Sequence, residues 1–217
     1  SGPINYGEML IEAREEIDKG GSLETIVMLG EQIENSVSWD TMLDDGDVVN
    51  TKKMEERTSQ VNVEDRMILA YTSGTTGHPK GVTHCHKPVR NTYERAMLLG
   101  HNSNDVHLSY LPLFHAYGFS EVAMMVALTG ASQVLFDVFD PDEVLDAVES
   151  ERGTVLHGFD SHWADLIRAQ TERARDVSSL RVGTLPAGMK STIPTARLAQ
   201  DIFCPTTSGF GMSETWA

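Results

Sequence analysis

Long hydrophobic runs are missing from this sequence. The most apolar stretch, residues 122–136, is interrupted by polar residues and is too short to span a bilayer. The first ten residues have neither a basic start nor an apolar run, so no signal peptide is predicted. We therefore expect a soluble, cytoplasmic protein without a transmembrane segment.

Cysteines and basic residues are also scarce. Cys85 and Cys204 lie far apart in the chain, which fits no metal or redox spacing and predicts reduced thiols. The 17 basic residues against 32 acidic ones give a net charge of -15. Such a surface repels polyanions, so we expect no nucleic-acid partner. It does not exclude a nucleotide, because a few local donors are enough to hold one.

The 217 residues suffice for one large domain or two small ones. A polar, charged stretch at residues 44–64 lacks hydrophobic periodicity and is predicted as a loop or weakly ordered connection. It is the best candidate for a boundary, which divides the chain into residues 1–64 and 65–217.

Strand-like and helix-like segments alternate along the chain. Short apolar runs predict strands at residues 25–29, 67–71, 106–111, 133–136, 154–157 and 181–185. Helical patterns occupy residues 9–18, 36–43, 89–99, 119–128, 141–151, 161–175 and 193–202. Ser36, Asp140 and Ser161 are candidate helix starts, and Pro141 suits a first turn. The alternation predicts an α/β fold of layered, mostly parallel sheets with helices on both faces.

One glycine-rich segment stands out directly after a predicted strand. Residues 71–81 read YTSGTTGHPKG. Its three glycines allow backbone N–H groups to approach an anion, four hydroxyls add donors, and Lys80 adds a positive charge. It is no Walker A motif, because Pro79 stands where that pattern has its second glycine. The plain alternative is a glycine-rich surface turn that carries Ser and Thr; against it stands the resemblance of the whole eleven-residue string to the phosphate-binding motif of adenylate-forming enzymes.

Two further motifs follow in order, and together the three resemble those of adenylate-forming enzymes. Residues 111–118 read LPLFHAYG and residues 208–215 read SGFGMSET. The chain is most similar to acyl-CoA synthetases, with weaker similarity at residues 185–189 (LPAGM). Residues 158–160 read GFD, where those enzymes usually have Gly-Val-Pro, so Asp160 is a departure.

The resemblance implies roles for individual residues. Phe210 would stack on adenine, Ser213 would contact the α-phosphate and Glu214 would ligate Mg²⁺, and Lys80, Ser213 and Glu214 form the implied catalytic set. His115, Phe119 and Phe159 would line the acyl pocket. The implied ATP- and AMP-binding residues are Thr72, Ser73, Gly74, Thr75, Thr76, Gly77, Lys80, Ala187, Gly188, Gly209, Phe210, Gly211 and Ser213.

The resemblance further implies ATP-dependent activation of a carboxylic acid to its acyl-adenylate, and then to an acyl-CoA thioester, with ATP, Mg²⁺ and coenzyme A. Residues 1–64 would end a first α/β subdomain, and residues 65–217 would carry the ATP and acyl sites. The family's ribose-binding aspartate and its lysine-bearing C-terminal domain find no counterpart. We therefore expect an internal fragment of the large N-terminal domain, inactive alone, whose uncovered surfaces favour a homo-oligomer.

Two alternatives remain. The first is an amino-acid or aryl-acid adenylation domain. Amino-acid adenylation domains normally place Asp after the Phe of the second motif, to pair with an α-amine, whereas this chain has His115, so an acid without an α-amine is favoured. The other alternative is a fragment that binds nucleotide without turning it over. Chain length of the acid and the acceptor thiol are not predicted.

Overall fold

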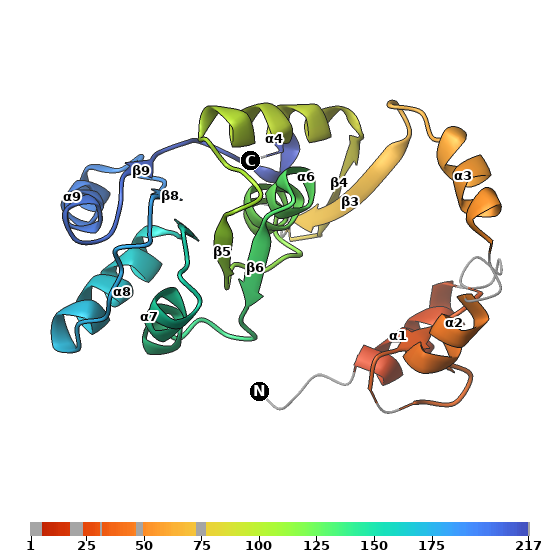
Figure 1. The fold of residues 1–217 in the computed structure, drawn as a ribbon. Coiled ribbons are helices and arrows are strands. Elements are labelled where there is room, and N and C mark those ends of the chain that lie inside the picture. Colours follow the sequence, from red (N-terminus) through yellow and green to blue (C-terminus); the bar gives the residue numbers. More distant parts are fainter. Residues whose placement is uncertain (1–5, 18–23, 31, 47–49, 73–76, 217) are drawn as a thin grey trace. The chain divides into compact units, whose positions relative to one another are not determined.

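A computed structural model describes residues 6–17, 24–30, 32–46, 50–72 and 77–216. The chain divides into two compact units, Ser1–Val61 and Asn62–Ala217, and each is described by itself (Figure 1). Both cysteines are free, as expected from their spacing.

The first unit is small and mostly helical. It contains α1 (Tyr6–Ile17), a parallel pair of two-residue strands, β1 (Val27–Met28) and β2 (Val37–Ser38), and then α2 (Trp39–Gly46). The hydroxyl of Ser38 accepts a hydrogen bond from the backbone N of Thr41 at 3.1 Å. The start expected at Ser36 was therefore wrong, because residues 37–38 pair as a strand.

The prediction of a loop across residues 44–64 was also wrong, because α3 (Thr51–Ser59) lies within it. Asn50 caps this helix, and its side chain accepts from the backbone N of Lys53 at 3.0 Å. No residue of α3 is buried, so the helix has no apolar face. Hydrophobic periodicity could not reveal it, and the cap was the available signal.

The second unit is built on a five-stranded sheet in which every pairing is parallel. Its strand order is β6–β5–β7–β8–β9. The strands are β5 (Val106–Ser109), β6 (Ser132–Leu135), β7 (Val155–His157), β8 (Val182–Thr184) and β9 (Thr206–Thr207). Four of them coincide with predicted strands, and β9 was not expected. The predicted parallel α/β fold is confirmed.

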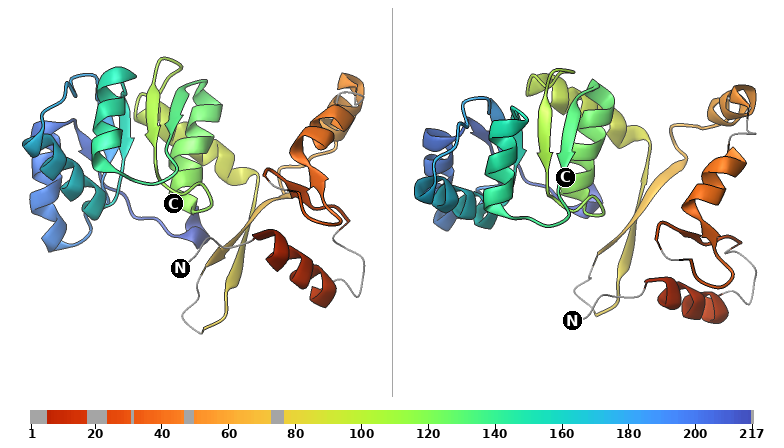
Figure 2. Two further views of the ribbon diagram at one scale, coloured as in Figure 1. Left: turned by 90° about the horizontal axis from the view of Figure 1, so that it is seen from below. Right: turned by 60° about the horizontal axis from the view of Figure 1, so that its bottom comes forward.

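Helices cover both faces of this sheet, since β5 and β6 lie between α7 and α6 (Figure 2). The helices are α4 (Lys87–Leu98), α5 (Ala116–Gly118), α6 (Met125–Thr129), α7 (Pro141–Ser150), α8 (Asp160–Glu172) and α9 (Ile193–Ile202). Between α5 and α6 runs a π-helix, η1 (Phe119–Met124), and two 3-10 turns are η2 (Lys190–Thr192) and η3 (Ser213–Thr215).

Two of these helices show how sequence sets their starts. Asp140 caps α7 by accepting from the backbone N of Asp142 and Glu143 at 2.9 and 3.0 Å, with Pro141 in the first turn. Helix α8 begins at Asp160 rather than at Ser161, because the ring of His162 accepts from the backbone N of Phe159 and fixes the turn there.

The core of this unit lies between the sheet and helices α7 and α8. Trp163 is fully buried and donates its indole N–H to the carbonyl of Thr184 at 3.1 Å, so its polar atom is satisfied. Around it are packed Leu108, Val144, Leu145, Val148, Leu156, Leu166 and Leu185. This packing fixes the strands whose carboxyl ends carry the site.

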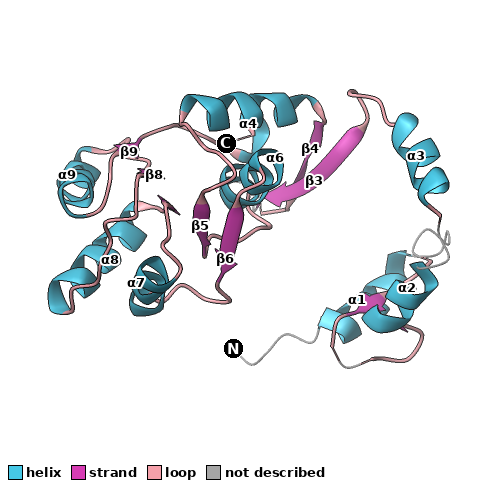
Figure 3. Cartoon of the chain, viewed as in Figure 1, coloured by secondary structure: helices cyan, strands magenta, loops and turns pink. Residues whose placement is uncertain are grey.

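An antiparallel hairpin of β3 (Arg66–Thr72) and β4 (Lys80–Cys85) precedes the sheet (Figure 3). Strand β3 was predicted and β4 was not, because Gly81 and the charged and polar residues around it mask its alternation. In the register, Thr72 pairs with Lys80, so the glycine-rich segment connects the two strands. Its residues Ser73, Gly74, Thr75 and Thr76 lie outside the described part of the chain.

Candidate functional site

A cavity of about 980 Å³ opens in the second unit. Its walls come from the hairpin, from α4 and from the segments that follow β5, β7, β8 and β9. In a parallel sheet the carboxyl ends of all strands meet at one edge, where ligands of α/β proteins bind. The lining residues are Thr72, Lys80, Arg95, Leu98, Leu99, His115, Ala116, Tyr117, Glu121, Phe159, Thr184, Pro186, Gly188, Thr207 and Ser208–Glu214.

The hairpin contributes the start of the glycine-rich motif and its lysine. Thr72 and Lys80 both line the cavity, and Lys80 is exposed. Gly77 has a φ of 84°, a left-handed conformation that glycine adopts without strain. The hairpin thus places a cation and a hydroxyl at the cavity wall.

The last motif runs along the cavity. Phe210 is 88% exposed there, and Glu214 is exposed as well. Ala187 is not among the lining residues, but its backbone N donates to the hydroxyl of Ser208 at 2.8 Å. This bond ties the segment after β8 to the segment after β9.

Contacts with the hairpin and α4 hold the end of this motif. His84 Nε2 donates to the carbonyl of Ser213 at 2.6 Å. Trp216 is buried, donates its indole N–H to Thr92 Oγ1 at 3.1 Å, and meets the ring of His84 edge-on with centroids 5.0 Å apart. The backbone around Glu214 is therefore fixed on both sides.

Two of the three residues predicted for an acyl pocket line the cavity together. His115 Nδ1 accepts from the backbone N of Tyr117 at 3.2 Å, and its ring faces that of Phe159 edge-on at 6.4 Å. Phe119 is not among the lining residues; its ring packs on Trp216 at 5.7 Å. Gly118 is required here, because a Cβ would lie 2.3 Å from the carbonyl oxygen of Pro112.

Sequence reasoning missed several polar side chains of the cavity wall. Arg95 on α4 forms an ion pair with Glu121 on η1, whose side chain is 9% exposed. The hydroxyl of Tyr117 is hydrogen-bonded to Thr184 Oγ1. Burial raises the pKa of this phenol well above its usual value. These pairs are distant in sequence and follow no spacing rule, so only the fold brings them together.

The chemistry of the wall suits a nucleotide. Lys80 supplies positive charge, Thr72 and Ser213 supply hydroxyls, and Phe210 offers an exposed aromatic ring. Glu214 provides an exposed carboxylate, the ligand type that Mg²⁺ prefers.

Among the described residues, no helix is long and apolar enough to cross a membrane.

Comparison with known proteins gives consistent similarities. The AMP-binding enzyme family matches residues 8–217. A feruloyl-CoA synthase of Amycolatopsis is 32% identical over 160 residues, which is 71% of this chain and 31% of that protein. The 4-coumarate–CoA ligase 1 of Oryza sativa is 28% identical over 205 residues, 88% of this chain and 35% of the relative.

Solved structures show the same fold. The O-succinylbenzoate coenzyme A synthetase (MenE) of Bacillus subtilis, in complex with AMP, matches with a TM-score of 0.62 and 28% identity over 72% of this chain and 39% of that one. A luciferase-like enzyme of the mealworm Zophobas morio reaches a TM-score of 0.74 over 97% of this chain and 48% of that one, at 18% identity.

The chain spans about a third of the length of the curated relatives it matches. Within that span, the family match covers nearly every residue, including all three motifs. The parallel sheet with its covering helices agrees with the fold of the structural neighbours. On these grounds the chain belongs to the AMP-binding enzyme family.

Proposed function

We propose that this chain carries the ATP- and acid-binding site of an enzyme that activates a carboxylic acid as its acyl-adenylate and transfers the acyl group to coenzyme A. The observation that carries the proposal is the convergence of Lys80, Phe210 and Glu214 on the cavity that His115 and Phe159 also line. These residues come from segments far apart in sequence, and one nucleotide beside one acid accounts for all of them.

The phosphates of ATP lie at the hairpin. Lys80 offsets the charge of the β- and γ-phosphates, and Thr72 donates from its hydroxyl. The resemblance assigns further phosphate donors to Ser73, Gly74, Thr75, Thr76 and Gly77, of which the first four lie outside the described residues. Because phosphoryl chemistry depends on positioning and charge stabilisation, Lys80 affects both binding and rate.

The nucleoside lies along the last motif. Phe210 stacks on adenine, and the glycines on either side of it, with Ala187 and Gly188, let the backbone approach closely. Ser213 donates to the α-phosphate. Glu214 would hold Mg²⁺, which would supply positive charge to offset the charge that develops on the phosphates.

The acid lies beside His115 and Phe159. Its carboxylate oxygen attacks the α-phosphorus, the bond to the bridging oxygen breaks, and pyrophosphate leaves. The thiol of coenzyme A then attacks the acyl carbon, and AMP leaves as the acyl-phosphate bond breaks. Phe119 supports this wall indirectly, through its packing on Trp216.

The acid class follows from the relatives and from the wall. The names of two relatives refer to ferulic acid and 4-coumaric acid. Both are aromatic acids without an α-amine. The rings of His115 and Phe159, which meet edge-on, offer apolar and aromatic surface against which an aromatic or acyl group can pack. Aryl acids are therefore the first substrates to test.

The test is a calorimetric titration of the chain with Mg²⁺-ATP. Saturable binding is expected, and Lys80→Ala should weaken it by about tenfold or more, because one charged contact to phosphate is worth roughly 1.5–3 kcal/mol. Lys52→Ala on α3 is the matched control, since Lys52 is exposed in the first unit. Equal binding by wild type and Lys80→Ala would contradict the proposal.

A further inference from the structure

A second polar cluster lies in the core of the same unit, away from the solvent. It consists of His101, Asp105 and His107, with His157 beside them. His107 comes from β5, His157 from β7, and the other two from the segment between α4 and β5. Their exposed fractions are 2%, 2%, 0% and 1% in chain order.

The histidines of this cluster have no hydrogen-bond partners for most of their ring nitrogens. In the described part of the chain, both ring nitrogens of His101 and of His107 are buried without a partner, and so is Nε2 of His157. Buried polar atoms are normally paired, because leaving one unpaired costs free energy. Five such atoms in one place mark the cluster as a candidate ligand site, in which His101 and His107 can each offer one nitrogen.

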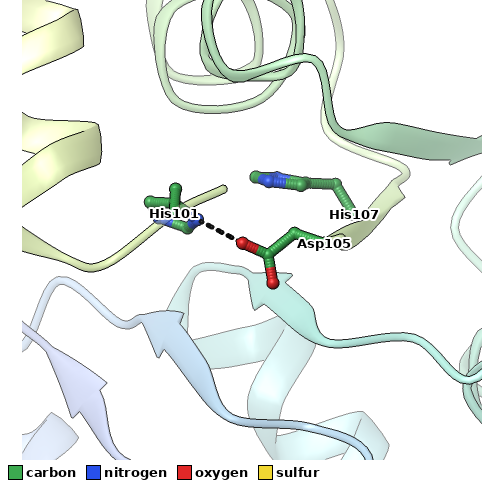
Figure 4. A group of neighbouring side chains, drawn as sticks. All are labelled: His101, Asp105 and His107. Atoms are coloured by element: carbon green, nitrogen blue, oxygen red, sulfur yellow. Dashed lines mark ion pairs between the residues drawn. The ribbon is translucent and has the colours of Figure 1, made fainter. Parts of the chain in front are cut away.

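The three side chains present their donor atoms to a common point (Figure 4). His101, Asp105 and His107 each offer one ligand atom, and these atoms lie within 4.8 Å of one another. His101 Nδ1 is 3.7 Å from Asp105 Oδ2, which is too far for a hydrogen bond. The ring centroids of His101 and His107 are 5.1 Å apart, so the two rings are neighbours in the same buried cluster.

We propose that His101, Asp105 and His107 form a binding site for a divalent transition-metal ion of the zinc class. Imidazole nitrogen with one carboxylate suits Zn²⁺, Ni²⁺ and Cu²⁺, whereas Mg²⁺ and Ca²⁺ prefer oxygen ligands. The site is separate from Glu214, which is exposed.

The surroundings of Asp105 set the strength of the site. Its oxygens accept from Thr154 Oγ1 at 2.7 Å and from the backbone N of Asn102 at 2.9 Å, which fix the carboxylate. Both oxygens also accept from Arg181, a cation that competes with a metal. An ion at Oδ2 has to displace Arg181 from that oxygen, and the side chain of Arg181 is 34% exposed. Affinity is therefore lower than in a site without an arginine.

The site ties together elements that shape the cavity. The metal links the segment after α4 to β5. The ring of His157 lies 5.7 Å from that of His107. Its Nδ1 is hydrogen-bonded to Thr184 Oγ1 at 2.9 Å, and Thr184 lines the cavity. The role of the ion is structural: it stabilises the second unit and does not contact the reacting groups.

The test uses the full chain, stripped of metal with a chelator and titrated with Zn²⁺ alone by calorimetry. One equivalent should bind, and both His101→Gln and His107→Gln should weaken binding by at least about tenfold. His86→Gln is the matched control, because His86 precedes α4 and makes no side-chain capping bond. Circular dichroism of each variant checks that it folds.

Co²⁺ provides a second measurement that needs no variant. Bound at two imidazoles and a carboxylate in a buried site, it should give intense visible absorption that Zn²⁺ abolishes on addition. The proposal is overturned if the folded wild type shows no saturable one-equivalent binding and no such spectrum. It is equally overturned if His86→Gln weakens binding as much as His107→Gln does.

Discussion

At the scale of single residues, the end of the last motif depends on side chains that the proposed ligands do not touch. Trp216 fills a buried position and donates to Thr92, while His84 donates to the carbonyl of Ser213. Glu214 lies between these two anchors. Its carboxylate is exposed, but its backbone is held by the buried contacts of its neighbours.

Replacing Thr92 by Val tests this arrangement. The substitution keeps shape and removes the acceptor of the Trp216 indole N–H, which should cost about 1–3 kcal/mol in the free energy of unfolding. Loosening residues 213–216 should also weaken Mg²⁺-ATP binding several-fold, because Ser213 and Glu214 lose their fixed position. Thermal unfolding and calorimetry measure the two effects.

Thr171→Val is the control for that substitution. Thr171 is exposed on α8, and its hydroxyl donates within its own helix to the carbonyl of Ile167. Thr171→Val should change neither the free energy of unfolding nor the affinity for Mg²⁺-ATP appreciably. If Thr92→Val leaves ATP affinity as unchanged as Thr171→Val does, the buried anchor does not position Glu214.

At the scale of elements, local sequence patterns predicted the helices and strands whose formation depends on residues close together in the chain. Helices with an apolar face, such as the capped α7 and the uncapped α9, and buried strands such as β7 were predicted within a few residues. The fully exposed α3 and the two-residue β9 were missed, because neither has an apolar period. The motifs pointed to Lys80, Phe210 and Glu214, but the Arg95–Glu121 pair could not be predicted, since only packing of α4 on η1 brings those residues together.

The cap of α7 allows a test at this scale. Asp140→Ala removes the side chain that accepts from two backbone N–H groups and should cost about 0.5–2 kcal/mol of stability. Asp137→Ala, at an exposed residue of the preceding loop, removes the same charge without removing a cap and should have little effect. Urea unfolding measures both, and equal losses would show that charge rather than capping stabilises α7.

At the scale of the whole molecule, the cavity belongs to one unit. Every residue that lines it lies between Thr72 and Glu214, and the chain divides at Val61 and Asn62. The overall charge of -15 gives ATP no general attraction, so binding depends on local donors of the second unit.

Hydrogen exchange with and without Mg²⁺-ATP should therefore separate the two units. A ligand present at 100 times its Kd stabilises the form it binds by about 2.7 kcal/mol, and only amides that exchange through opening of that form are slowed. Protection should rise in β3, β4 and residues 206–216, while α1, α2 and α3 keep their rates. Lys80→Ala at the same ATP concentration should lower the added stabilisation to about 1.4 kcal/mol or less, because its Kd is about tenfold weaker or more. A rise of equal size in α1 and α2 would mean that nucleotide binding and the first unit are energetically coupled, contrary to a site built by the second unit alone.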